Sequence, residues 1–280
     1  MDSLVTTDWL ERELGAGDLR VIDSTLFLPS DSRDARSEYE AEHIPGAVFL
    51  DLDEVSDSSS PLPHMVPSEA KFASRMASLG LRDGQRFVVY DNSPLHSAAR
   101  AWWMLRNFGA HHVAILDGGL QKWKAEGRPL ESGRPQVRHG HFSPRFAAGA
   151  VADKAAVAGL LGDGVHEIVD ARGRGRFTGE EAEPRPGMAS GHIPGSKNLP
   201  QGDLFKPDNS WKRGDELRSA FGDAGVDLRR PMVATCGSGV TACVLLFGAH
   251  LLGKEDVRLY DGSWSEWGSD PATPKATGPA

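Results

Sequence analysis

Two absences bound what this chain of 280 residues can be. It contains only two cysteines, Cys236 and Cys243, and such a pair cannot form the disulfide framework of a secreted domain. It also lacks an uninterrupted apolar run of about eighteen residues, and residues 1–15 show no charged-then-apolar leader. We therefore expect no membrane span, no secretory signal and a reducing, cytoplasmic location.

The chain also lacks an excess of positive charge. The formal net charge is −8 and the pI is near 5.7, whereas nucleic acids and anionic lipid surfaces attract basic faces. The composition therefore argues against a nucleic-acid or membrane partner. An anionic small molecule would need a local group of arginines.

Internal repetition determines the expected fold. His43-Ile44-Pro45-Gly46 recurs 149 residues later as His192-Ile193-Pro194-Gly195, and Asp117-Gly118 recurs 144 residues later as Asp261-Gly262. Each half alternates short apolar runs with helical segments, which is typical of a parallel sheet covered by helices. We predict an α/β protein with tandem domains at residues 1–130 and 151–280 and a linker at 131–150. The predicted helices span residues 7–14, 68–79, 97–108, 154–161, 215–221 and 240–252.

Cys236 opens a loop of small residues between an apolar run, residues 231–234, and a helix-like run, residues 242–252. Backbone N–H groups of such a loop and the positive end of the following helix both stabilise a thiolate. Ligands of open α/β sheets also bind at the carboxyl ends of strands. These residues alone still leave open a buried structural cysteine, because cysteine is among the most frequently buried residue types.

The two halves differ at this position, where the first half carries Asp91. A carboxylate cannot serve as a thiol nucleophile and repels anions, so we expect the first domain to be structural and substrate-shaping. We expect Cys243 to be a packed core residue rather than a resolving thiol.

The repeated His-Ile-Pro-Gly, the final Asp-Gly-x-x-x-x-Trp element ending at Trp267, and the loop Cys236-Gly237-Ser238-Gly239-Val240-Thr241 together resemble the tandem-domain rhodanese superfamily. The resemblance extends over residues 7–274 and is closest to the 3-mercaptopyruvate sulfurtransferase branch. It implies two domains, each with a mainly parallel five-stranded sheet and helices on both faces, and an active site in the cleft between them. It implies neither a metal nor an organic cofactor, and we expect the protein to be a monomer.

The same resemblance assigns roles to individual residues. Cys236 would take sulfur from 3-mercaptopyruvate as a persulfide, release pyruvate, and pass the sulfur to cyanide or a thiol, with thioredoxin as one candidate. Asp53 and His64 would form a hydrogen-bond relay with Ser238. The remaining roles are a backbone cradle for the persulfide, from Gly237, Gly239, Val240 and Thr241, and a pair of arginines for the substrate carboxylate and carbonyl, Arg176 and Arg185. Outside the family motif, we expect Arg172 and Arg174 to be solvated loop charges.

Two other functions stay open at this point. A thiosulfate:cyanide sulfurtransferase shares the architecture, although cationic residues usually follow its cysteine, where this chain has the uncharged Gly237 and Ser238. A catalytically silent rhodanese-like module that binds a partner or relays sulfur is the other. A cysteine phosphatase is disfavoured, because Ala242 stands where its phosphate-binding arginine would be.

Overall fold

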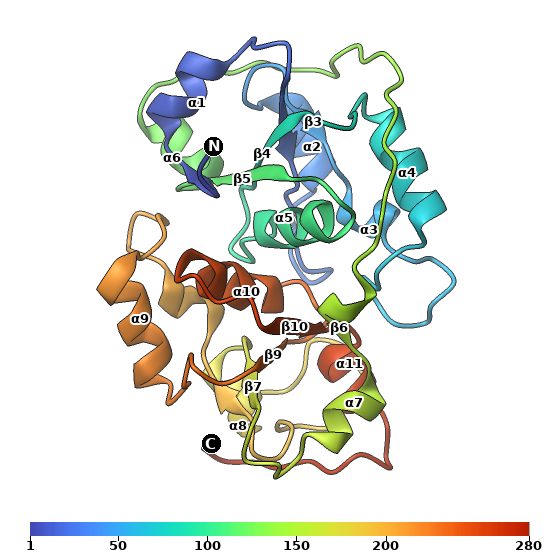
Figure 1. Ribbon diagram of the computed structural model, residues 1–280, viewed down its shortest axis with the longest axis vertical. Coiled ribbons are helices and arrows are strands. Elements are labelled where there is room, and N and C mark those ends of the chain that lie inside the picture. Colours follow the sequence, from blue (N-terminus) through green and yellow to red (C-terminus); the bar gives the residue numbers. More distant parts are fainter. Residues whose placement is uncertain (280) are drawn as a thin grey trace. The chain divides into compact units, whose positions relative to one another are not determined.

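The computed structural model describes residues 1–279 and divides into two compact units (Figure 1). Unit 1 consists of residues 1–58, 66–147 and 207–210, and unit 2 of residues 59–65, 148–206 and those from 211 onward. Two short segments, residues 59–65 and 207–210, therefore belong to a different unit from the residues on either side of them in the chain. One of these, residues 59–65, carries His64 into unit 2.

Unit 1 is built on a five-stranded sheet in the order β1-β5-β4-β2-β3, and all of its strand pairs are parallel. Its strands are β1 (Leu4–Val5), β2 (Leu19–Asp23), β3 (Val48–Phe49), β4 (Arg86–Tyr90) and β5 (His112–Leu116). Its helices are α1 (Thr7–Glu13), α2 (Ala35–Ala41), α3 (Leu52–Val55), α4 (Glu69–Ser78), α5 (Ala98–Asn107) and α6 (Gly119–Ala125).

Helices cover both faces of this sheet. Along β4, Val88 and Tyr90 join a buried cluster that includes Leu10 of α1 and Trp123 of α6. On the other face α5 packs on β4 and β5. Successive side chains of a strand point to opposite faces, so strands buried on both sides read as continuous apolar runs.

Unit 2 repeats the plan in the order β6-β10-β9-β7-β8, again with parallel pairs throughout. Its strands are β6 (Val151–Ala152), β7 (Glu167–Asp170), β8 (Lys197–Asn198), β9 (Met232–Thr235) and β10 (Val257–Tyr260). Its α-helices are α7 (Lys154–Gly159), α8 (Arg174–Thr178), α9 (Gly214–Asp223), α10 (Ala242–Leu251) and α11 (Ser263–Trp267), and its 3₁₀ helices are η1 (Ala148–Ala150) and η2 (Gln201–Leu204). The two predicted five-stranded parallel sheets are confirmed.

Local sequence signals explain where several helices begin. The side chains of Thr6, Ser68 and Asp153 accept backbone N–H groups at the starts of α1, α4 and α7, which satisfies donors that a helix leaves unpaired. All six predicted helices are present, with ends within about two residues of those expected. Helix α10 is buried along its first eight residues, as an all-apolar helix should be.

The chain between α6 and η1 contains no helix or named strand. Much of it nevertheless packs on unit 1, since Gly140 N donates to Ala77 O at 2.7 Å and Ala147 N donates to Asn107 O at 2.8 Å. Across residues 1–279, no helix combines the length and apolar character needed to span a membrane.

Candidate active site

Cys236 follows the last residue of β9 and begins the loop that leads into α10 (Figure 1). Its residue surface is only 1% exposed. Over residues 1–279, the backbone N–H groups of Gly237, Ser238, Val240 and Thr241 donate to no protein oxygen or nitrogen. Parallel strands and the helix start thus bring a shielded thiol and a set of unused N–H donors into one loop, an arrangement suited to stabilising negative charge.

Ser263 organises this loop from 27 residues further along the chain. Its Oγ accepts hydrogen bonds from Cys236 N at 3.2 Å and Gly239 N at 3.1 Å, and donates to Tyr260 O at 2.8 Å. Ser263 is fully buried and has a φ of 50°, a conformation that non-glycine residues rarely adopt. We expected the N–H of Gly239 to be available to the persulfide, but it donates to Ser263 Oγ. The N–H of Ser238, which the prediction left out, donates to no protein oxygen or nitrogen within residues 1–279.

Two further contacts from the same segment fix the loop carbonyls. Trp264 N donates to Cys236 O at 2.9 Å, and Ser265 Oγ donates to Gly237 O at 2.7 Å. The sequence signal for this support was the repeated Asp-Gly-x-x-x-x-Trp element, which the prediction used to identify the duplication and the family resemblance but not to place a residue in the site. Its residues hold the cysteine loop in place.

His64 and Ser238 meet as the resemblance implied. His64 Nδ1 and Ser238 Oγ are 2.8 Å apart, and either group can be the donor, depending on the imidazole tautomer. His64 also has a positive φ of 60°. A residue held in this uncommon conformation with its ring on the loop serine is well placed for proton transfer near Cys236.

Asp53, the third member of the expected relay, belongs to unit 1. Its N–H donates to Asp51 Oδ1 at the start of α3, at 3.1 Å. Within unit 1, Asp53 lines a cavity of about 620 Å³ together with Arg33 and Arg36. Its link to His64 stays a prediction.

Arg176, in the middle of the short helix α8, lies against the cysteine loop. A Cβ atom at Gly237 would be 3.1 Å from Arg176 Nη2, so the absence of a side chain there lets the guanidinium approach the backbone. Glu183 accepts from Arg176 Nη2 at 2.5 Å and from Nε at 3.3 Å. Arg176 is therefore oriented by a carboxylate that is itself only 2% exposed.

The expectation for Arg172 was wrong. Its side chain is 1% exposed and forms ion pairs with Asp170 at 2.7 Å and Glu183 at 2.6 Å. Burial opposes the charge, but these carboxylates raise the pKa of the guanidinium above its ordinary value. Arg172 thus connects the core to Glu183, which orients Arg176. The sequence analysis assigned neither Arg172 nor Glu183 a role in the site.

The two other arginines of this segment differ from Arg172. Arg174 is exposed and pairs with Asp203 at 2.7 Å, as expected of a surface charge. Arg185 is half-buried in the segment between α8 and β8, two residues after Glu183. Cys243 is fully buried in the first turn of α10, with Sγ 3.3 Å from Gly239 O, which fits a packed core cysteine.

The matching loop of unit 1 carries a half-buried carboxylate in place of the thiol. Asp91 Oδ1 accepts from Ser93 N at 3.0 Å, and Oδ2 accepts from Ala98 N at 2.8 Å. Burial raises the pKa of Asp91 to about 6, although both N–H groups act to lower it. This loop therefore holds an anionic group of its own.

Comparison with known proteins follows the duplication. The rhodanese-like domain family matches residues 6–126 and 153–270. The 3-mercaptopyruvate sulfurtransferase of Homo sapiens is 43% identical over 95% of this chain and 91% of its own length. A mitochondrial thiosulfate/3-mercaptopyruvate sulfurtransferase of Arabidopsis thaliana is 39% identical over 98% of this chain and 78% of its own length.

A solved structure extends the likeness to three dimensions. The crystal structure of SseA from Escherichia coli, described as a 3-mercaptopyruvate sulfotransferase with the rhodanese fold, superposes with a TM-score of 0.87. It is 40% identical, and the match covers 95% of this chain and all of that one. Both sequence and fold are therefore shared over nearly the full length.

Proposed function

Because the chain belongs to the rhodanese-like domain family and carries two copies of that domain, we propose that it moves sulfur from 3-mercaptopyruvate through Cys236 to a thiol or cyanide acceptor. One observation of the site carries the proposal. A shielded cysteine at the carboxyl end of β9 stands in a loop with four backbone N–H groups that have no protein oxygen or nitrogen acceptor within residues 1–279. A persulfide anion needs this kind of donor set.

The first half-reaction forms the persulfide. The Cys236 thiolate attacks the sulfur of 3-mercaptopyruvate, an S–S bond forms, and the bond between that sulfur and the substrate methylene carbon breaks. The electron pair stays on carbon as the pyruvate enolate, which takes up a proton to give pyruvate. His64 and Ser238, 2.8 Å apart, are the groups we assign to proton transfer in this step.

The second half-reaction returns the free enzyme. An acceptor thiolate or cyanide attacks the outer sulfur, the S–S bond breaks, and the electron pair returns to Cys236 as a thiolate. This is ping-pong chemistry, in which the donor product leaves before the acceptor reacts. We keep thioredoxin as a candidate acceptor, and a monomer in the cytoplasm as the expected state. The plant relative is named as mitochondrial.

The surroundings of the loop favour a 2-oxo acid over thiosulfate. Arg176 lies against Gly237 and can hold a carboxylate with paired, charge-assisted hydrogen bonds. Gly237 and Ser238 add no cation next to the sulfur to meet the second charge of thiosulfate. Thiosulfate sulfurtransfer is the second candidate, because the plant relative is named for both donors.

Steady-state kinetics with both donors test this assignment. We expect 3-mercaptopyruvate to give a higher kcat/KM than thiosulfate with cyanide as acceptor, and Cys236→Ser to remove activity with either donor. Cys243→Ser is the matched control, because it changes the other buried cysteine and keeps a hydrogen-bond donor toward Gly239 O. A higher kcat/KM with thiosulfate would reverse the donor assignment. Transfer from neither donor would favour a silent module.

A further inference from the structure

Unit 1 contains a cavity of about 440 Å³ at the end of its sheet opposite Asp91. Residues just before or at the start of β2, β3 and β4 line it, whereas Asp91 follows the carboxyl end of β4. The first copy of the His-Ile-Pro-Gly motif contributes Pro45 and Gly46 to its wall. The cavity has the size of an ordinary small-molecule site.

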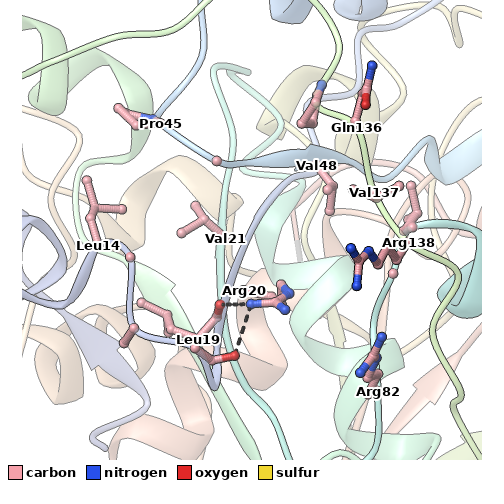
Figure 2. A pocket seen from close by; sticks show the side chains of 17 residues that line it. Leu14, Leu19, Arg20, Val21, Pro45, Val48, Arg82, Gln136, Val137 and Arg138 are labelled. Carbon is pink, nitrogen blue, oxygen red and sulfur yellow. Dashed lines mark hydrogen bonds between the residues drawn. The ribbon is translucent and has the colours of Figure 1, made fainter.

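Three arginines line this cavity, and no aspartate or glutamate does. Figure 2 shows the guanidinium groups of Arg20, Arg82 and Arg138 on one side of the cavity, with Leu14 and Pro45 on the other. None of the three forms an ion pair with a carboxylate of residues 1–279. In a chain with a net charge of −8, a group of arginines without carboxylate partners indicates a site for an anion from solution.

Nearby carboxylates are already committed elsewhere. Glu13 and Asp18 both pair with Arg86, each at 2.7 Å. Arg20 donates through Nη1 to Leu19 O at 2.7 Å and to Gly17 O at 3.3 Å. These two backbone acceptors orient the Arg20 guanidinium, which interacts with the Asp18 carboxylate only at a distance and helps to lower the pKa of Asp18 after the larger effect of Arg86.

Close backbone packing positions the other two arginines. Gly80 has a φ of 73°, and a Cβ atom there would lie 2.9 Å from Arg138 O. A Cβ atom at Gly140 would lie 2.1 Å from Leu81 O. Only glycine permits this approach of the segments that carry Arg82 and Arg138, so the fold brings the two charges to one cavity before any ligand binds.

Apart from Gln136, the other side chains that line the cavity are apolar. Leu14, Leu79 and Val137 are among them, and Val137, at 43% exposure, is one of the most exposed large apolar side chains of the described residues. Inorganic phosphate would leave this surface in water, whereas an aromatic base would cover it. We propose that the cavity binds a nucleoside phosphate, with its phosphates on Arg20, Arg82 and Arg138 and its base against Leu14 and Pro45 on the other side.

Calorimetric titration of the full chain with ADP, adenosine and inorganic phosphate tests this site. ADP should bind at least about tenfold more tightly than adenosine or phosphate, because it alone uses both the arginines and the apolar wall. Adenosine binding as tightly as ADP would overturn the role of the arginines. Phosphate binding as tightly as ADP would overturn the nucleoside part, and a lack of ADP binding would overturn the whole proposal.

Charge-reversed variants locate the binding. Arg82→Glu and Arg138→Glu should each weaken ADP binding by about tenfold or more, since each loses charge-assisted contacts. Arg229→Glu is the matched control, because its side chain is 90% exposed in unit 2 and the change in net charge is the same. Unchanged ADP affinity in both cavity variants would place the site elsewhere. Sulfurtransferase activity reports the folding of each variant independently.

Discussion

The two units place the same loop after equivalent strands and use it in opposite ways. In unit 1, Ser93 N donates to Asp91 Oδ1, Leu95 N donates to Ser93 Oγ at 3.0 Å, and Asn92 N donates to Thr25 Oγ1 at 2.9 Å. In unit 2, the equivalent N–H groups have no protein oxygen or nitrogen acceptor within residues 1–279. The N–H groups of the first loop thus have acceptors within unit 1, whereas those of the second loop are available to a ligand.

The support beneath each loop differs in the same sense. Gly119 of unit 1 has a φ of 57°, and a Cβ atom there would lie 2.6 Å from Asp91 O. Its counterpart Ser263 accepts the same type of conformation and adds a hydroxyl that binds two loop N–H groups. A strained non-glycine residue at this point is a feature of the cysteine unit and fits a functional role there.

The largest expected effect comes from making the second loop like the first. Cys236→Asp should lower kcat/KM with 3-mercaptopyruvate by about 10⁴-fold or more, because the nucleophile is lost. The protein should stay folded, since the carboxylate can accept the N–H of Ser238 as Asp91 accepts that of Ser93. Kinetics and thermal unfolding measure the two effects, with Cys236→Ser as the control. Retained activity would show that Cys236 is not the nucleophile, and that this residue is not what distinguishes the second loop from the first.

An arginine near the second loop gives the next effect. Arg185→Ala should raise the KM for 3-mercaptopyruvate by about tenfold with a smaller change in kcat, because a ground-state contact to the carboxylate is lost. Arg174→Ala is the matched control, because Arg174 is exposed and paired with Asp203. An unchanged KM would remove Arg185 from the substrate site.

The supporting serine should have a similar or smaller effect. Ser263→Gly keeps a residue that tolerates the φ of 50° but removes the acceptor for Cys236 N and Gly239 N. We expect kcat/KM to fall by about fivefold, from the loss of roughly 1 kcal/mol of loop organisation. A variant with wild-type kinetics would mean that backbone geometry alone holds the loop.

The last expected effect leaves catalysis unchanged and concerns the stability of unit 1. Because the pKa of folded Asp91 is raised to about 6 from 3.8, its contribution to stability is complete below about pH 4 and is lost as the pH rises through 6. Asp91→Asn does not titrate. Its free energy of unfolding relative to the wild type should therefore increase by up to about 3 kcal/mol between about pH 4 and pH 7.

Denaturant unfolding at several pH values measures this difference. The constant cost of replacing a carboxylate by an amide does not depend on pH, so the slope alone reports the titration of Asp91. A difference that stays flat with pH would show that the pKa of Asp91 is not raised as described.

The sequence was sufficient for the fold, the duplication and the position of the cysteine loop. These features depend on local periodicity and on motifs that are contiguous in the chain. Arg172 was misjudged because its burial depends on Glu183 and on Gly191 O, its acceptor at 2.8 Å, 19 residues away. Local composition does not encode such partners.

The support of the loop was hidden for the same reason. Ser263 reaches Cys236 only because β9 and β10 are neighbours in the sheet. A serine in the sequence does not indicate a positive φ, whereas a glycine at that position would have indicated a turn. The N–H of Gly239 was assigned to the persulfide for lack of this competing acceptor.

Intact-protein and peptide mass spectrometry after exposure to 3-mercaptopyruvate without an acceptor tests the central claim most directly. The account predicts the addition of one sulfur atom to the peptide that contains Cys236, with release of one pyruvate, and its removal when cyanide is added. Sulfur found on Cys243, or pyruvate released with no sulfur on either cysteine, would contradict it.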